Sequence, residues 1–185
     1  MESKNINYNE EWLKGGLILA GVSILLTMLT YVIDVSLMVE WWFGIVSSLI
    51  SMGLLIYLGI NYRNDIGGIL SYGGAFKFSF LVFLVSYVIG IIFQIALYTV
   101  IDPELPEVIK LLTIEKTIET MEAWGMSDEA VVDAAIIGVE DGIDEATTPM
   151  GMIKSSPWGI LFLLFFSAIA AIFIKRNPPV SDRIN

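Results

Sequence analysis

The sequence predicts an all-α membrane protein: a four-span transmembrane helical bundle with an acidic extracytoplasmic helical hairpin between spans three and four. The 185-residue chain is 56% hydrophobic and 16% charged, whereas a soluble domain carries about a quarter charged residues. Its apolar residues gather in four charge-free runs, each long enough to cross a bilayer. We therefore expect one membrane domain over residues 1–185, with spans at about 15–35, 41–61, 76–101 and 155–175 and an insertion at 102–154.

The first two spans form a predicted antiparallel hairpin. The run Gly15–Ile33 follows a polar start, but it is too long for the core of a signal peptide and has no small-x-small cleavage site. Asp34–Glu40 is a short acidic link. The aromatic residues Trp41–Phe43 then begin the second run, where such rings sit at headgroup level.

A polar segment, Asn61–Lys77, joins the two halves of the chain. Its Gly-Gly pairs favour turns, and Ser71 or Tyr72 is expected to start the next helix. The third run, Phe78–Ile101, contains twenty-four residues without a charge. Asp102 precedes a proline, which disfavours helical geometry at that residue and predicts the end of the run.

The insertion reads as two helices. In Glu104–Trp124 the helical period predicts one largely apolar side. It comprises Val108, Leu111, Ile114 or Glu115, Ile118, Met121 and Ala123 or Trp124. Gly125 suits a helix C-terminus, and Ser127 suits the next N-cap. A second helix should run to about Val139, and an acidic loop (Glu140, Asp141, Asp144, Glu145) should follow it.

The last span is predicted over Ser155–Ile174, with Pro157-Trp158 at its start and Lys175-Arg176 at its end. Each span holds a pair of small residues four apart, which allows close helix packing within the bundle or in an oligomer. These pairs are Gly16/Ala20, Gly44/Ser48, Ser86/Gly90 and Ser167/Ala171.

The distribution of charge predicts the orientation. Residues 102–156 hold thirteen acidic residues and three lysines, a net charge of −10, which equals that of the whole chain. Because cytoplasmic loops are rich in Lys and Arg, we expect both termini in the cytoplasm and residues 102–154 on the far side of the cytoplasmic membrane. The side taken as cytoplasmic holds seven basic residues: Lys4, Lys14, Arg63, Lys77, Lys175, Arg176 and Arg183.

Three stretches resemble a known family. They are YRNDIGGILSYGGAFKFS at Tyr62–Ser79, YTVIDPE at Tyr98–Glu104 and GMSDE at Gly125–Glu129. The chain is similar in these stretches to Domain of Unknown Function family 4199, small four-span membrane proteins of Bacteroidota-type bacteria. The resemblance implies a bacterial inner membrane and brings no established activity or catalytic residue.

Composition excludes several function classes. The chain has no cysteine and no histidine, so thiolate metal sites, Ser-His-Asp triads and HExxH zinc sites are impossible. An acidic chain is also not a nucleic-acid binder. No enzyme activity, metal or cofactor is expected.

The candidate site is the segment between spans two and three. Arg63, Lys77 and nearby glycines could approach a phosphate or ligand, although structural anchoring and hinging are the favoured interpretation. Arg63 and Asp65 could also pair with each other or with a neighbouring helix. The residues singled out there are Arg63, Asp65, Gly67, Gly68, Tyr72 and Lys77. Gln94 is the candidate buried polar residue, expected to face the bundle.

The leading functional hypothesis is a non-enzymatic anchoring or interaction protein. Its partners would be the lipid bilayer and, through the helices at 104–140, a protein or a second copy of the chain. The alternative is a small-solute or ion transporter or channel subunit that works as an oligomer. No run contains a buried charge, the usual mark of a transport path, so this alternative ranks second.

Overall fold

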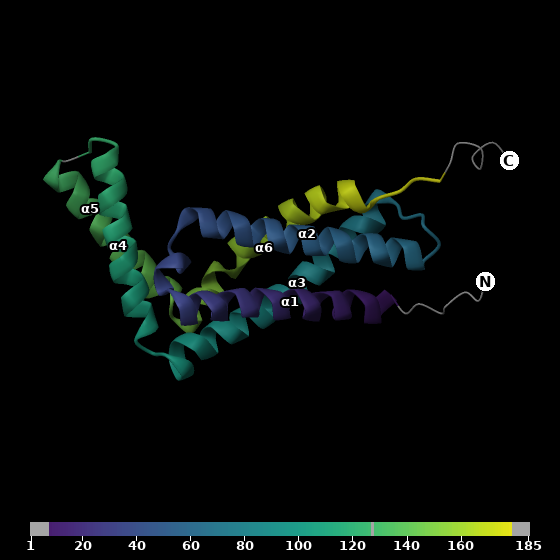
Figure 1. The fold of residues 1–185 in the computed structure, drawn as a ribbon, viewed down its shortest axis with the longest axis horizontal. Coiled ribbons are helices and arrows are strands. Elements are labelled where there is room, and N and C mark those ends of the chain that lie inside the picture. Colours follow the sequence, from purple (N-terminus) through teal and green to yellow (C-terminus); the bar gives the residue numbers. More distant parts are fainter. Residues whose placement is uncertain (1–7, 127, 179–185) are drawn as a thin grey trace. The chain divides into compact units, whose positions relative to one another are not determined.

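The computed structural model describes residues 8–126 and 128–178 and shows an all-α protein in these ranges (Figure 1). The described residues form six α-helices. A 3₁₀ turn (η1) lies between α1 and α2, and a π-helical turn (η2) lies between α3 and α4. Their bounds are α1 Tyr8–Ile33, η1 Val35–Met38, α2 Trp41–Asp65, α3 Tyr72–Ala96, η2 Leu97–Ile101, α4 Leu105–Ala123, α5 Glu129–Ala146 and α6 Pro149–Ile174.

Four helices are long and apolar enough to cross a membrane, which makes this a multi-pass membrane protein. The candidate spans are Glu10–Ile33, Trp41–Asp65, Tyr72–Ile101 and Pro149–Ile174. Helices α4 and α5 form a hairpin between the third and fourth spans. The predicted fold class, four spans with a helical hairpin before the last, is confirmed.

The chain forms two compact units, and the long helices contribute to both. Among the described residues, the first unit contains 8–24, 46–90 and 158–178, and the second contains 25–45, 91–126 and 128–157. The first unit holds most of α2, the greater part of α3 and the second half of α6. The second unit holds the hairpin and the segments that lead into it.

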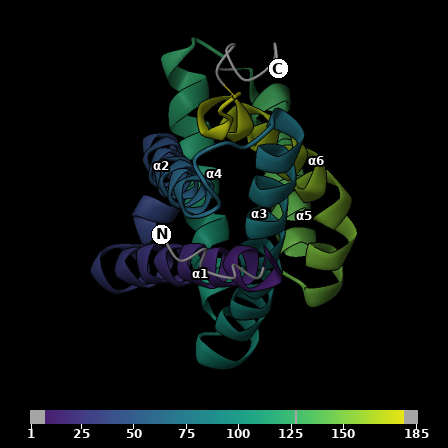
Figure 2. The same ribbon diagram turned by 90° about the vertical axis from the view of Figure 1, so that its right-hand side faces the viewer.

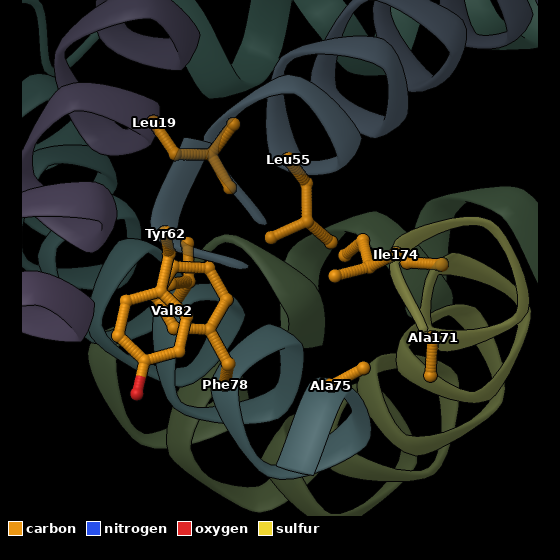
Figure 3. Packing of buried hydrophobic residues seen from close by; sticks show 9 residues of the cluster. Leu19, Leu55, Tyr62, Ala75, Phe78, Val82, Ala171 and Ile174 are labelled. Carbon is orange, nitrogen blue, oxygen red and sulfur yellow. The ribbon is translucent and has the colours of Figure 1, made fainter. Parts of the chain in front are cut away.

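The first unit has an apolar core to which four helices contribute (Figure 3). Figure 2 shows the start of α1, the end of α2, the start of α3 and the yellow end of α6 arranged around one interior. The rings of Tyr62 and Phe78 stack at 4.6 Å between centroids. The fully or almost fully buried core side chains include Leu19, Leu55, Phe78, Val82, Ala171 and Ile174.

Two of the predicted small-residue pairs close this unit. A Cβ built on Gly16 would lie 2.5 Å from Cβ of Val85, so α1 approaches α3 closely only because Gly16 has no side chain. Ala20 is almost fully buried, and Ser167 and Ala171 are fully buried in α6. These pairs serve packing within the chain.

In the second unit, α4 ends as predicted. Gly125 has a φ of +72°, and the amide of Met126 donates to the carbonyl of Met121 at 2.9 Å. The amide of Gly125 donates to the carbonyl of Glu122 at 2.9 Å. These two bonds make a Schellman cap, which uses glycine because the left-handed region disfavours a Cβ.

The helix α5 differs from its prediction at both ends. Ser127, the expected N-cap, lies outside the described residues, and Asp128 caps the helix by accepting from the amides of Ala130 and Val131 at 3.0 and 3.3 Å. The helix continues to Ala146, so the acids expected in a loop occupy its last turns. Acidic residues near a C-terminus oppose the helix dipole, but here two of them pair with lysines.

The helix α6 also begins earlier than predicted. Thr148 Oγ1 accepts from the amide of Gly151 at 3.0 Å, and Pro149 occupies the first helical position, where its missing N–H costs nothing. Pro157, which was expected to start the helix, lies inside it. Either Pro149 or Pro157 could have begun the helix. It begins at Pro149, because Thr148 before it caps the first turn.

The predicted apolar side of α4 is wrong in part. Val108 and Leu111 are 42% and 59% exposed, while Leu105 and Met121 are buried. Apolar residues occur on several sides of α4, because Ile109 and Leu112 also lie between the expected positions. Periodicity alone therefore could not select the buried face.

The close approach of α1 and α3 predicts opposite effects for two glycine substitutions in α1. Gly16→Ala should lower stability by about 1–3 kcal/mol, because the new Cβ would collide with Val85. Gly21→Ala is the matched control, since no described atom lies within 4 Å of a Cβ built there. Alanine favours helix over glycine, so the control should be neutral or stabilising.

The measurement is thermal unfolding of the purified protein in one detergent. Equal stability of the two variants would contradict the assigned packing.

Candidate functional site

Arg63, near the end of α2, binds the end of α6. Its Nη1 donates to the carbonyl oxygen of Ile174 at 2.9 Å. The last carbonyls of a helix have no partner within the helix, and a cation is favoured beside them. Of the two pairings considered for Arg63, the structure shows the one with a neighbouring helix and, among the described residues, no ion pair with Asp65.

The loop after α2 holds the same end of α6. Leu70 and Arg176 exchange backbone hydrogen bonds of 3.0 and 2.8 Å as an isolated antiparallel bridge. The hydroxyl of Tyr72 donates to the carbonyl of Ala168 at 3.2 Å. Nζ of Lys175 lies 5.7 Å from the centroid of the Tyr72 ring, within cation–π range. We call this set, Arg63, Leu70 and Tyr72 with residues 168–176, the α6 clasp.

The glycines of the loop serve its backbone geometry. Gly67 and Gly68 have φ values of +103° and +81°, which L side chains rarely adopt. The amide of Gly68 donates to the carbonyl of Arg63 at 2.8 Å, and that of Gly67 donates to Asn64 at 3.3 Å. Because both amides are engaged, they are not available to cradle a phosphate. This geometry is that of a tight turn, and the hinge interpretation stays a prediction.

A second cluster joins α1 to α3. Nζ of Lys77 lies 5.3 Å from the ring centroid of Tyr8, and this ring meets Tyr62 edge-on at 5.8 Å. Burial, together with the nearby Tyr62, raises the pKa of Tyr8 above its usual value. Ser71 begins α3 by accepting from the amide of Gly74 at 3.2 Å. Asp65 belongs to neither cluster and lines a cavity described below.

Gln94 does not occupy the position that we expected. Its side chain is exposed, and its amide nitrogen donates to the hydroxyl of Tyr98 on its own helix at 3.0 Å. The expectation that it faces the bundle is therefore wrong. A partner one turn away, beside the π-helical turn Leu97–Ile101, is enough to satisfy the amide.

Sequence reasoning missed the role of Asp102. Its Oδ1 accepts from the amides of Glu104 and Leu105, each at 3.1 Å, and its Oδ2 accepts from the hydroxyl of Tyr31 at 3.0 Å. One carboxylate thus starts α4 and fixes it to the end of α1. An aspartate before a proline and a helix is a cap signal in the sequence, but nothing there indicated Tyr31.

The link between the first two spans is built around Asp34 and Glu40. Asp34 accepts from the amide of Ser36 at 2.9 Å and so caps η1. Bonds from the side chain and the amide of Ser36 lower the pKa of Asp34. Glu40 pairs with Lys116 of α4 at 3.1 Å, which attaches the hairpin to this link.

All three lysines of the insertion are engaged within the chain. Lys110 bridges Glu107 and Asp144 at 2.6 and 3.1 Å, and these carboxylates raise its pKa. Lys116 and Lys154 pair with acids too, Lys154 with Glu145 at 3.7 Å. Seven insertion acids make neither an ion pair nor a helix cap among the described residues: Glu104, Glu115, Glu122, Glu129, Asp133, Glu140 and Asp141.

Three of these acids share one face of α4 with exposed apolar side chains. Positions 104, 108, 111, 115 and 122 follow the helical period. Val108 and Leu111 lie between the carboxylates and are exposed. We call this face the outer stripe; it comprises Glu104, Val108, Leu111, Glu115 and Glu122.

The α6 clasp predicts different effects for its two arginines. Arg63→Ala should lower stability by about 1.5–3 kcal/mol, because a hydrogen bond from a charged donor is lost. Arg176→Ala is the matched control: it removes the same charge, but only the backbone of Arg176 makes the bridge to Leu70.

Thermal unfolding in detergent measures the difference, and hydrogen exchange at the Leu70 amide reports on the loop. If Arg176→Ala destabilised the protein as much as Arg63→Ala, the hydrogen bond to Ile174 would not be the cause.

The lowered pKa of Asp34 predicts acid-sensitive opening of η1. A carboxylate whose folded pKa is depressed stabilises the fold above its unfolded value of about 3.9, and this contribution is lost as pH falls through the folded pKa. Exchange at the Ser36 amide should therefore accelerate below about pH 4 beyond the intrinsic rate. In Asp34→Asn this acid-dependent step should vanish; its persistence would point to another titrating group.

A comparison with known protein families finds a match. The profile of the family described as "Protein of unknown function (DUF4199)" matches residues 14–176. No curated protein and no solved structure matches the chain. The match begins in the second turn of α1 and ends in the α6 clasp, so it includes the hairpin, the last three spans and the first span apart from residues 10–13. The chain belongs to the DUF4199 family.

Proposed function

We propose that this protein is a non-enzymatic membrane anchor that holds a basic partner protein on the outer stripe of its α4–α5 hairpin. The observation that carries the proposal is the exposure of Val108 and Leu111 between unpaired carboxylates. Exposed apolar side chains framed by charge are typical of a contact surface. The four spans would serve to fix this surface to the membrane.

The negative charge of the outer stripe favours a basic partner protein. Glu104, Glu115 and Glu122 would be opposed by the same carboxylates of a second copy, and like charges placed opposite each other cost several kcal/mol. Anionic headgroups would be repelled for the same reason. A partner with lysine or arginine around an apolar centre meets both requirements.

The basic residues support a cytoplasmic position for the α6 clasp. Arg63 and Lys175 lie at the clasp, and Lys77 lies at the start of α3 in the same unit. Such a concentration of cations at one end of a membrane unit follows the positive-inside rule. The proposal therefore places both termini in the cytoplasm and residues 102–154 outside the inner membrane.

A cavity in the first unit favours a second candidate, a transporter or channel subunit for small solutes or ions. Three serines of α2, with Met52, Phe83 and Phe166, line a cavity of about 210 Å³. Oγ of Ser47 is buried there without a hydrogen-bond partner among the described residues. The exposed position of Gln94 gives no support to a path along α3, so the anchor remains the preferred function.

Photocrosslinking in intact membranes tests the proposal. A photoreactive residue at Leu111 should capture a basic protein, while one at Leu17 of α1, which is also exposed, should capture lipid. Glu115→Lys should reduce capture at Leu111 by about tenfold or more, because it places like charges together.

The matched control is Asp133→Lys, which makes the same change in net charge on α5. Equal loss in both variants would mean that net charge alone, and not the outer stripe, attracts the partner. Crosslinks at Leu111 that stay within the chain or join two copies would contradict the proposal.

A further inference from the structure

A cavity with charges of both signs lies between the start of α1, the end of α2 and the start of α3. Its volume is about 210 Å³. It belongs to the first unit and is separate from the serine-lined cavity. Its lining residues are Glu11, Lys14, Gly15, Ile18, Leu58, Asn61, Tyr62, Asp65 and Phe78.

The position of the cavity along the spans is that of a headgroup. Glu11 and Lys14 lie at the beginning of the first span, and Asn61 and Asp65 lie at the end of the second. Because these spans are consecutive, the beginning of one and the end of the next face the same membrane boundary. The polar wall of the cavity therefore lies where lipid phosphates and amines are found.

The polar wall presents a cation beside two carboxylates. Glu11 and Lys14 are three residues apart on α1, and Asn61 and Asp65 are four apart on α2, so each pair shares a helix face. Among the described residues, none of the three charged side chains makes an ion pair. They are free to bind a ligand that itself carries both charges.

The remaining wall is apolar. Ile18, Leu58 and Phe78 line it, and Phe78 is held by its stack on Tyr62. Gly15 is buried, and a Cβ there would lie 3.1 Å from Cγ2 of Val82, so its missing side chain allows α1 to lie against α3 at this level. A zwitterionic headgroup with the first carbons of its lipid fits such a surface.

We infer that this cavity binds a phosphoethanolamine group, as carried by a phospholipid of the surrounding membrane. Lys14 would contact the phosphate, and Glu11 and Asp65 would accept from the ammonium. With two carboxylates and one lysine the cavity is net negative, which disfavours anionic headgroups. A primary ammonium donates three hydrogen bonds, which a trimethylated amine cannot do, so ethanolamine is preferred over choline.

Lipid retention tests the inference on the full-length protein. The protein is delipidated and placed in nanodiscs that contain equal parts of phosphatidylethanolamine, phosphatidylglycerol and phosphatidylcholine. Bound lipid is then counted by native mass spectrometry after mild extraction. We expect phosphatidylethanolamine to be enriched about tenfold over the other two, as one or two charge-assisted bonds supply.

Two variants attribute the preference to the cavity. Asp65→Asn should reduce the preference over phosphatidylcholine, because an acceptor for the ammonium loses its charge, and Lys14→Gln should reduce total phospholipid retention. The matched control is the pair Asp141→Asn and Lys154→Gln, which changes the same charges outside the cavity. Thermal unfolding of each variant identifies any that fails to fold. If Asp65→Asn fails, Glu11→Gln replaces it, because it removes the other acceptor for the ammonium; if Lys14→Gln fails, Lys14→Met replaces it.

Soluble phosphoethanolamine distinguishes the two sources of the ligand. Displacement of the lipid by the soluble compound supports the site and assigns recognition to the headgroup alone. If phosphatidylethanolamine is enriched but the soluble compound does not displace it, the site is supported and the acyl chains contribute to the affinity. Equal retention of the three lipids, or a preference that survives both cavity variants, would overturn the inference.

Discussion

The carbonyl oxygen of Ile174 is the acceptor on which the arrangement of the first unit depends. It lies in the last turn of α6, where no amide of the helix can reach it. Ile174 is fully buried, and a buried carbonyl without a hydrogen-bond partner is costly. Arg63 satisfies it at 2.9 Å, which requires the end of α2 to lie beside the end of α6. Leu70 and Tyr72 then find their own partners on α6.

Hydropathy predicted the spans because burial in lipid leaves a strong and local signal. It could not fix the ends of the helices, which depend on single capping bonds. Thr148 accepts from a backbone amide and starts α6 where composition had suggested a loop. Asp128 caps α5 one residue after the expected N-cap, Ser127. Pro157 misled the prediction because proline is common at helix starts, yet a membrane helix tolerates it inside.

The sequence could indicate which residues belong to the candidate site, but not which atoms they contact. Arg63, Gly67 and Gly68 stood out because they interrupt two long apolar runs, as basic residues and glycine pairs do in turns between membrane spans. The residue that Arg63 contacts is 111 positions away, and it contributes a backbone oxygen that carries no sequence signal. The prediction for Gln94 was wrong for a different reason. Its partner, Tyr98, is only one helical turn away in the sequence, but the prediction assumed that an amide in a membrane span must face the bundle.

The charge balance of the insertion limits what the hairpin can bind. Lys110, Lys116 and Lys154 all pair with acids of the chain itself, so they hold α4, α5 and the first link in place. None remains to neutralise the carboxylates of the outer stripe. Under the proposed function, the partner of Val108 and Leu111 would therefore bring its own cations as well as an apolar group. This requirement follows from which lysines are already used, and net charge alone could not establish it.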